Sequence, residues 1–82
     1  MNKEETRVRI GQRVASLRKL ARLTQEELAV RAGLQRTHIG RIEDGRYGVN
    51  VETLQAIAEA LGMTVDLVEP QLADLRVVKM KT

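Results

Sequence analysis

The stretch QEELAVRAGLQRTHIGRIED, residues 25–44, decides the fold because it predicts two short helices that meet at a tight turn. Ala29 is small enough for one helix to cross another there, and Gly33 can supply the positive φ angle of the turn. Ile39 and Ile42, about one helical turn apart, would anchor the second helix on a core. The opposite face of that second helix would then be free to enter a groove.

Capping residues predict the limits of this helix pair. Thr24 and Glu27 have the spacing of a capping box, so the first helix should begin at Gln25. Its inner face would consist of Leu28, Ala29 and Ala32. The second helix should begin near residue 35 or 36 and stop at Asp44-Gly45.

Two further amphipathic helices flank the pair. The first should run from about residue 4 to residue 21, with a core stripe of Ile10, Val14, Leu17 and Ala21. The other should begin after Asn50, an N-cap residue type, and end at Gly62. Its core stripe would be Val51, Leu54, Ile57, Ala58 and Leu61. The chain is therefore predicted to be mainly α, with four to five short helices.

The last twenty residues have a different pattern. Residues 63–67 alternate apolar and polar side chains before Pro70, which favours a short strand, and residues 75–80 fit either a second strand or a frayed tail. A strand needs a partner, within the chain or across a two-fold axis. We therefore expect residues 1–62 to form the main domain and residues 63–82 to be a dimerisation extension. Its expected contacts are Val65, Leu67, Val68, Val77 and Val78.

The charge is distributed unevenly along the chain. The 82 residues carry 14 Lys and Arg against 11 Asp and Glu, a net charge of +3. Residues 1–50 hold 11 basic and 6 acidic side chains, whereas residues 51–82 hold 3 basic and 5 acidic ones. This asymmetry is expected if the first part meets a polyanion and the last part meets protein. On charge alone, a merely solvated surface is an equal alternative.

Composition argues against several other functions. One small domain has little room for an active-site cleft, and the sequence has no phosphate-cradling glycine loop, nucleophile–base pair or carboxylate cluster. With no cysteine and with His38 as the only histidine, we expect no cofactor and no metal site. One Tyr and no Phe or Trp argue against stacking of single-stranded bases.

The start of the chain, MNKEE, has no apolar signal region, and no stretch approaches membrane-spanning length. These features predict a soluble cytoplasmic protein with no membrane partner.

Several spaced motifs resemble the Cro/repressor-like (Xre-type) helix-turn-helix family over about residues 9–68. They are IGQRV (10–14), LTQEELA (23–29), AGL (32–34), IGRIEDG (39–45), VETL (51–54) and IAEALG (57–62). The resemblance implies a lambda-repressor-like domain from a bacterium or phage that associates with the nucleoid when bound. It also implies a homodimeric transcriptional regulator, most often a repressor, with two recognition helices in successive major grooves of an operator.

The resemblance also implies which residues meet DNA. Arg36 and Arg41 suit guanine best, because the guanidinium fork matches O6 and N7. Thr37 could touch a thymine methyl group or a phosphate, while Gln25 could lie near a phosphate or brace the recognition helix. His38 fits packing or a phosphate contact. The complete implied set is Gln25, Gln35, Arg36, Thr37, His38, Gly40, Arg41, Arg46 and Tyr47.

Three positions within the resemblance concern structure more than recognition. In this family an arginine late in the first helix often pairs with a glutamate near the end of the recognition helix, which implies a brace between Arg18 and Glu43. Arg22 stands where the family usually has glycine, so the first helix should end differently or store strain. Gly40 lies inside the recognition helix, where either close approach to DNA or loss of base reading would explain it.

Three other functions remain open on the sequence alone. The same fold would serve an antitoxin that binds a toxin protein and regulates its own operon, or a restriction-modification controller. From a different class, the basic face could bind an acidic protein with no DNA target.

Overall fold

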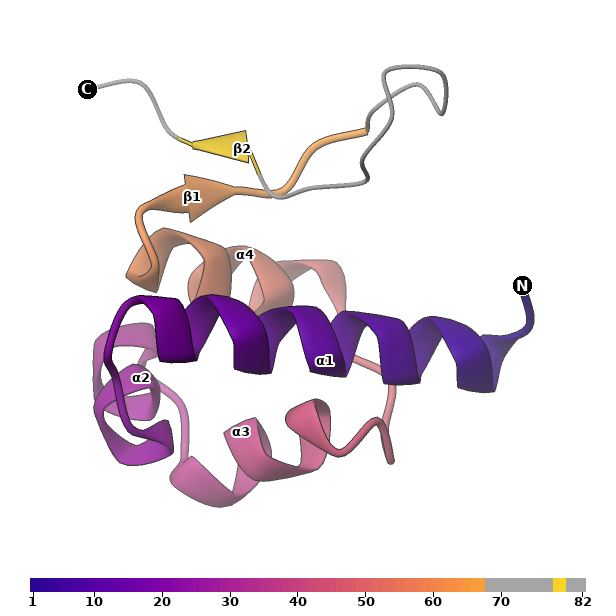
Figure 1. Ribbon diagram of the computed structural model, residues 1–82, viewed down its shortest axis with the longest axis horizontal. Helices are drawn as coiled ribbons and strands as arrows, with labels where there is room; N and C mark the ends of the chain where they lie inside the picture. The colour runs from indigo at the N-terminus through magenta and orange to yellow at the C-terminus, as the bar shows by residue number, and fades with distance from the viewer. Residues whose placement is uncertain (68–77, 80–82) are drawn as a thin grey trace.

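The computed structural model describes residues 1–67 and 78–79, and its core is helical. The elements are α1 (Lys3–Leu20), α2 (Gln25–Ala32), α3 (Arg36–Glu43), α4 (Val51–Ala60), β1 (Met63–Thr64) and β2 (Val78–Lys79). In Figure 1, α1 extends across the molecule, with α4 above it, α3 below it and α2 near its C-terminal end. The predicted mainly α fold is confirmed.

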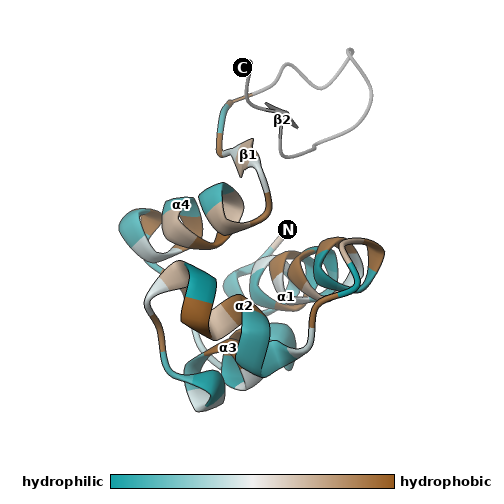
Figure 2. Ribbon diagram, turned by 90° about the vertical axis from the view of Figure 1, so that its left-hand side faces the viewer, coloured by the Kyte–Doolittle hydropathy of each residue, from teal (hydrophilic) through white to brown (hydrophobic). Residues whose placement is uncertain are grey.

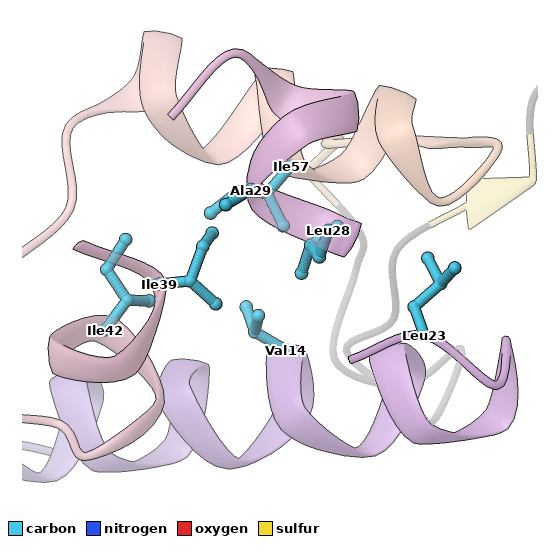
Figure 3. Close-up of a cluster of buried hydrophobic side chains, with 7 residues drawn as sticks. All are labelled: Val14, Leu23, Leu28, Ala29, Ile39, Ile42 and Ile57. Atoms are coloured by element: carbon cyan, nitrogen blue, oxygen red, sulfur yellow. The ribbon is translucent and has the colours of Figure 1, made fainter. Parts of the chain in front are cut away.

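The core lies where the four helices meet, as Figure 3 shows. Leu28, Ile39, Ile42 and Ile57 have relative exposures of 0 or 1 %. Burying a side chain of this size stabilises the fold by about 1.5 to 3 kcal/mol. Ala29 lies among them at 1 % exposure, so a small side chain is needed where α2 approaches its neighbours. The interior positions predicted for the helix-turn-helix pair are therefore confirmed at Leu28, Ala29, Ile39 and Ile42, while Ala32 is half-buried and packs against this core.

The predicted helix starts are formed by side-chain caps. The Glu27 amide donates to Thr24 Oγ1 at 3.0 Å, and the Thr24 amide donates to Glu27 Oε1 at 2.9 Å, completing a capping box. The hydrogen bond from the Thr24 amide holds the pKa of Glu27 below its usual value. Asn50 caps α4 by accepting from the Thr53 amide at 2.7 Å. Local sequence therefore determines where α2 and α4 begin.

The end of α1 differs from the prediction. Ala21 is exposed, not part of the core, because α1 ends at Leu20. Arg22 adopts the left-handed conformation with φ 59°, which confirms the strain expected at this position. The amides of Arg22 and Leu23 donate to the carbonyls of Lys19 (2.9 Å) and Arg18 (3.1 Å), a hydrogen-bond pattern that usually employs glycine at the left-handed residue.

The first turn of α4 also differs from the predicted core stripe. Val51 is 73 % exposed because it opens the helix on the solvent side, whereas Ile57 and Ala58 are buried. Leu54 and Leu61 pack at the edge of the core.

The strand after α4 is shorter than the predicted 63–67. The side chain of Gln55 accepts from the Val65 amide at 3.0 Å, and Asp66 Oδ1 accepts from the Leu67 amide at 2.8 Å. β1 ends at Thr64, and side-chain oxygens accept from these two amides beyond it.

β1 pairs antiparallel with β2 within the same chain, with Met63 opposite Lys79 and Thr64 opposite Val78. The structure therefore places strand pairing inside the protomer, one of the two arrangements that the sequence left open. Of the predicted dimerisation residues, Val65 is 36 % exposed and Leu67 is 98 % exposed. Val68 and Val77 lie outside the described residues, as do residues 75–76 and 80 of the predicted second strand.

Candidate nucleic-acid interface

Helix α3 has two faces with opposite properties. Ile39 and Ile42 are buried on the side toward the core, and the side chain of Glu43 is only 6 % exposed. Arg36, Thr37 and Arg41 are exposed, and Gly40 is half-buried. In Figure 2, hydrophilic residues colour much of the α3 ribbon. The exposed residues lie at positions that share one side of an eight-residue helix, so they can approach a ligand together.

Helix α1 crosses the end of α3 at Gly11. A Cβ atom at this position would overlap the carbonyl oxygen of Ile42 and lie 2.8 Å from that of Glu43. Only glycine permits this approach, which fixes α3 against α1. Gly11 lies within the family motif IGQRV (10–14), but the sequence alone does not predict this role for it. The available signal was a glycine beside the apolar stripe of a helix, where it costs up to about 1 kcal/mol relative to alanine.

Arg18 and Glu43 form the pair that the resemblance implied. Arg18 Nε donates to Glu43 Oε2 at 2.6 Å and Arg18 Nη2 donates to Oε1 at 3.0 Å, a bidentate geometry. Arg18 Nη1 also donates to the Leu23 carbonyl at 2.8 Å. Hydrogen bonding to Glu43 raises the pKa of Arg18 above its usual value. With side-chain exposures of 12 % and 6 %, the pair joins α1, the turn after it and α3.

Gln25 belongs to the same network. Its Nε2 donates to Glu43 Oε1 at 3.0 Å, and a Cβ atom on Gly40 would lie 3.7 Å from its Oε1. Of the two roles implied for this side chain, the structure shows contact with the recognition helix. We name Arg18, Gln25 and Glu43 the brace.

The turn after α3 holds Arg46 and Tyr47. Gly45 has φ 72° and lies against Val8, so that a Cβ atom there would be 2.9 Å from the Val8 Cα. The Arg46 amide donates to the Arg41 carbonyl at 3.2 Å, and the Gly45 amide donates to the Ile42 carbonyl at 3.0 Å. These two bonds form a Schellman motif, which gives the turn a defined path.

Side chains of this turn interact with the last turn of α3. The Arg41 Cζ lies 5.5 Å from the centroid of the Tyr47 ring. Arg46 Nε lies 3.9 Å from Asp44 Oδ2, with both side chains largely exposed. A pair of this kind in water contributes about 0 to 1 kcal/mol and leaves Arg46 available to other anions.

The predicted DNA-contact residues gather around α3 and the turn after it. Gln35, Arg36, Thr37, Arg41, Arg46 and Tyr47 are exposed, while His38 and Gly40 are half-buried. The first turn of α3 contains no acidic residue, so arginine dominates the charge of this surface. Such a surface can donate several charged hydrogen bonds to phosphates or to base edges.

Other kinds of site are not found in the part of the chain that the structure describes. No group of three or more His, Cys, Asp or Glu side chains there could hold a metal ion. Within those same residues, no helix has the length and hydropathy to cross a bilayer.

Comparison with known proteins places this arrangement among regulators. The family described as "Helix-turn-helix domain" matches residues 9–71. The immunity repressor protein of Bacillus phage phi105 is 42 % identical over 59 residues, covering 72 % of this chain and 41 % of the repressor. The chain therefore spans about two fifths of that relative's length. An uncharacterized HTH-type transcriptional regulator of Sinorhizobium fredii, y4dJ, is 40 % identical, covering 74 % of this chain and 80 % of the regulator.

A solved structure has the same arrangement of elements. The restriction-modification controller protein C.AhdI from Aeromonas hydrophila superposes with a TM-score of 0.69 and is 34 % identical. The match covers 82 % of this chain and 94 % of the controller, so almost the whole of that protein has a counterpart here.

Proposed function

Because this chain belongs to the Xre-type helix-turn-helix family of DNA-binding transcriptional regulators, which are not enzymes, we propose that it represses transcription as a homodimer on a two-fold symmetric operator. The exposed arginine-bearing face of α3, held on its opposite side by buried anchors, is the observation that carries this proposal. Two such helices would enter successive major grooves about 34 Å apart.

Individual residues have separate tasks in this proposal. Arg36 and Arg41 read guanine, and Thr37 touches a thymine methyl group or a phosphate. Arg46 binds phosphate, as does the N-terminal end of α2 at Gln25, where unpaired amides favour an anion. The phosphate contacts account for most of the affinity and make it fall steeply with salt. The same binding would associate the protein with the nucleoid in the cytoplasm of a bacterium.

Dimerisation in this proposal uses the extension after α4. Leu67 is 98 % exposed and Val65 is 36 % exposed, although both are apolar, and contact with a second copy would remove them from water. An isologous interface places the same residues on both sides of the two-fold axis. The proposal predicts that Leu67→Asp weakens dimerisation, measured by sedimentation, and lowers operator affinity as a consequence.

A restriction-modification controller is the second candidate. The 34 % identity and the likeness in fold to the restriction-modification controller protein C.AhdI favour it. Such a controller is also a DNA-binding regulator, so the two candidates share the α3 surface and differ in the promoter that they control.

Selection of bound duplexes from a random DNA pool tests the proposal. We expect a two-fold symmetric consensus, and a double variant Arg36→Ala/Arg41→Ala that binds it at least about 100-fold more weakly, since each guanine contact is worth about 1 to 3 kcal/mol. The charge-matched control is Arg13→Ala/Arg31→Ala, which removes two exposed arginines, one in α1 and one in the last turn of α2. Unchanged DNA affinity of the double variant, with dimerisation intact, would overturn the site and favour a protein-binding module.

A further inference from the structure

Tyr47 is the only Phe, Tyr or Trp in the sequence, yet it takes no part in the core. It is 56 % exposed and lies in the turn that follows α3. The Arg41 Cζ is 5.5 Å from its ring centroid, within the distance of about 6 Å at which a guanidinium is attracted to an aromatic face. The ring therefore neighbours one of the two arginines assigned to base reading.

The backbone holds these two residues in a fixed relation. The Schellman motif ties the Arg46 amide to the carbonyl of Arg41, the same residue whose guanidinium meets the ring. Gly45 lies against the backbone of Val8, so α1 supports the turn from behind. Tyr47 directly follows this tied segment, and its ring meets Arg41 in the protein without bound DNA.

The alternatives for the Arg41 side chain are few. Asp44, a carboxylate in this turn, pairs with Arg46 and not with Arg41: its Oδ2 atom lies 3.9 Å from Arg46 Nε. Among residues 1–67, the structure assigns no ion pair to Arg41. A guanidinium that stacks through its flat face keeps its N–H donors in the plane, where they can reach a guanine edge. Stacking and base reading are thus compatible.

We propose that Tyr47 is a positioning residue, whose ring holds the Arg41 guanidinium in the direction required for base reading. The inference rests on the proposed DNA-binding function and makes it more specific. An arginine side chain loses rotamer entropy when it is immobilised, and a contact with the ring that is already formed removes part of that loss from the binding step. The role belongs to the ring and acts through Arg41, in contrast to the direct DNA contact that the family resemblance implies for Tyr47.

Two substitutions separate the ring from the hydroxyl group. Tyr47→Phe keeps the aromatic face, so we expect its affinity for the selected duplex to stay within about twofold of wild type. Tyr47→Leu removes the face, and we expect a two- to fivefold loss, the equivalent of about 0.5 to 1 kcal/mol for an exposed stack. Against a duplex in which the guanine read by Arg41 is replaced, Tyr47→Leu should discriminate less than wild type. Adding Tyr47→Leu to Arg41→Ala should cost nothing further.

A measurement without DNA makes the test independent of the operator. In the nuclear magnetic resonance spectrum, the Arg41 δ protons should be shifted upfield by the ring in wild type and Tyr47→Phe, and should return to ordinary values in Tyr47→Leu. Absence of this shift in wild type, or a uniform loss of DNA affinity in Tyr47→Phe, overturns the proposal. If Arg41→Ala weakens binding while Tyr47→Leu does not, only the positioning role fails. If Arg36→Ala/Arg41→Ala leaves DNA affinity unchanged, the proposed function fails and the positioning role with it.

Discussion

The two faces of α3 differ in what they contact. The inner face packs against other residues of the chain, whereas the outer face is open to another molecule. On the inner face, Ile39 and Ile42 are buried, Gly11 leaves no space, and Glu43 accepts three hydrogen bonds from Arg18 and Gln25. On the outer face, Arg36 and Thr37 are exposed to water. One face thus sets where the helix lies, and the other sets what it can bind. Substitutions on the two faces should therefore separate the free energy of unfolding from DNA affinity.

Gly11→Ala should have the largest effect of any single change on the inner face. The new Cβ would overlap the Ile42 carbonyl oxygen, and backbone carbonyls at a helix crossing cannot rotate away as side chains can. We expect a loss of about 4 kcal/mol or more, above the usual 1 to 3 kcal/mol of overpacking. A domain of this size is stable by roughly 4 to 12 kcal/mol, so urea unfolding should show a large shift or an unfolded chain. A variant with wild-type stability would show that α1 and α3 do not meet this closely.

Arg18→Met should have the next largest effect, because it leaves the Glu43 carboxylate with only Gln25 as a side-chain donor. Removing one partner of a buried pair costs about 3 to 5 kcal/mol, and we expect the lower end since Arg18 retains 12 % exposure. The free energy of unfolding measures the loss. Operator affinity of the folded fraction should change far less than in the Arg36→Ala/Arg41→Ala variant.

A conservative control isolates the geometry of the brace. Arg18→Lys keeps the charge but loses the planar fork that reaches both Glu43 oxygens and the Leu23 carbonyl. Its stability should fall between wild type and Arg18→Met. Equal stability of all three proteins would mean that the pair contributes nothing to the position of α3.

Sequence patterns predicted most of the inner face because its determinants are local. Helix period placed Ile39 and Ile42 inward, and cap spacing placed the start of α2 after Thr24. The predicted burial of Ala21 and Val51 was wrong because both residues lie at helix ends. An apolar residue there can continue a stripe in the sequence without reaching the core.

Long-range features could not be predicted from spacing. The closeness of Gly11 to α3 depends on how separate segments meet in space. The Arg18–Glu43 pair came from family resemblance, since nothing in the residues between positions 18 and 43 indicates that these two meet. The DNA-contact set remains a prediction, because its partner is another molecule.

Arg22→Gly, in the exposed turn after α1, should raise the free energy of unfolding by about 1 kcal/mol. An arginine in the left-handed region costs about 1 to 3 kcal/mol, and glycine recovers this cost, less the entropy that it loses on folding. Arg22→Ala removes the same charge without that freedom, so it should gain nothing in thermal unfolding. If both variants are stabilised equally, the gain comes from lost charge repulsion and not from the backbone.

Gly40→Ala should give the smallest change in stability, and it is the matched counterpart of Gly11→Ala on the other face. The new Cβ would meet Gln25 Oε1 at 3.7 Å, an ordinary contact, so helix propensity should raise the free energy of unfolding by about 0.5 to 1 kcal/mol.

Contacts within the protein thus do not require glycine at position 40. A requirement for glycine there would have to come from a bound molecule. If DNA approaches the helix there, the added methyl group should weaken operator binding even as the protein becomes more stable. Titration of the selected duplex with Gly40→Ala decides between the two explanations: weaker binding assigns position 40 to the contact surface, and unchanged binding means that bases are not read at this position.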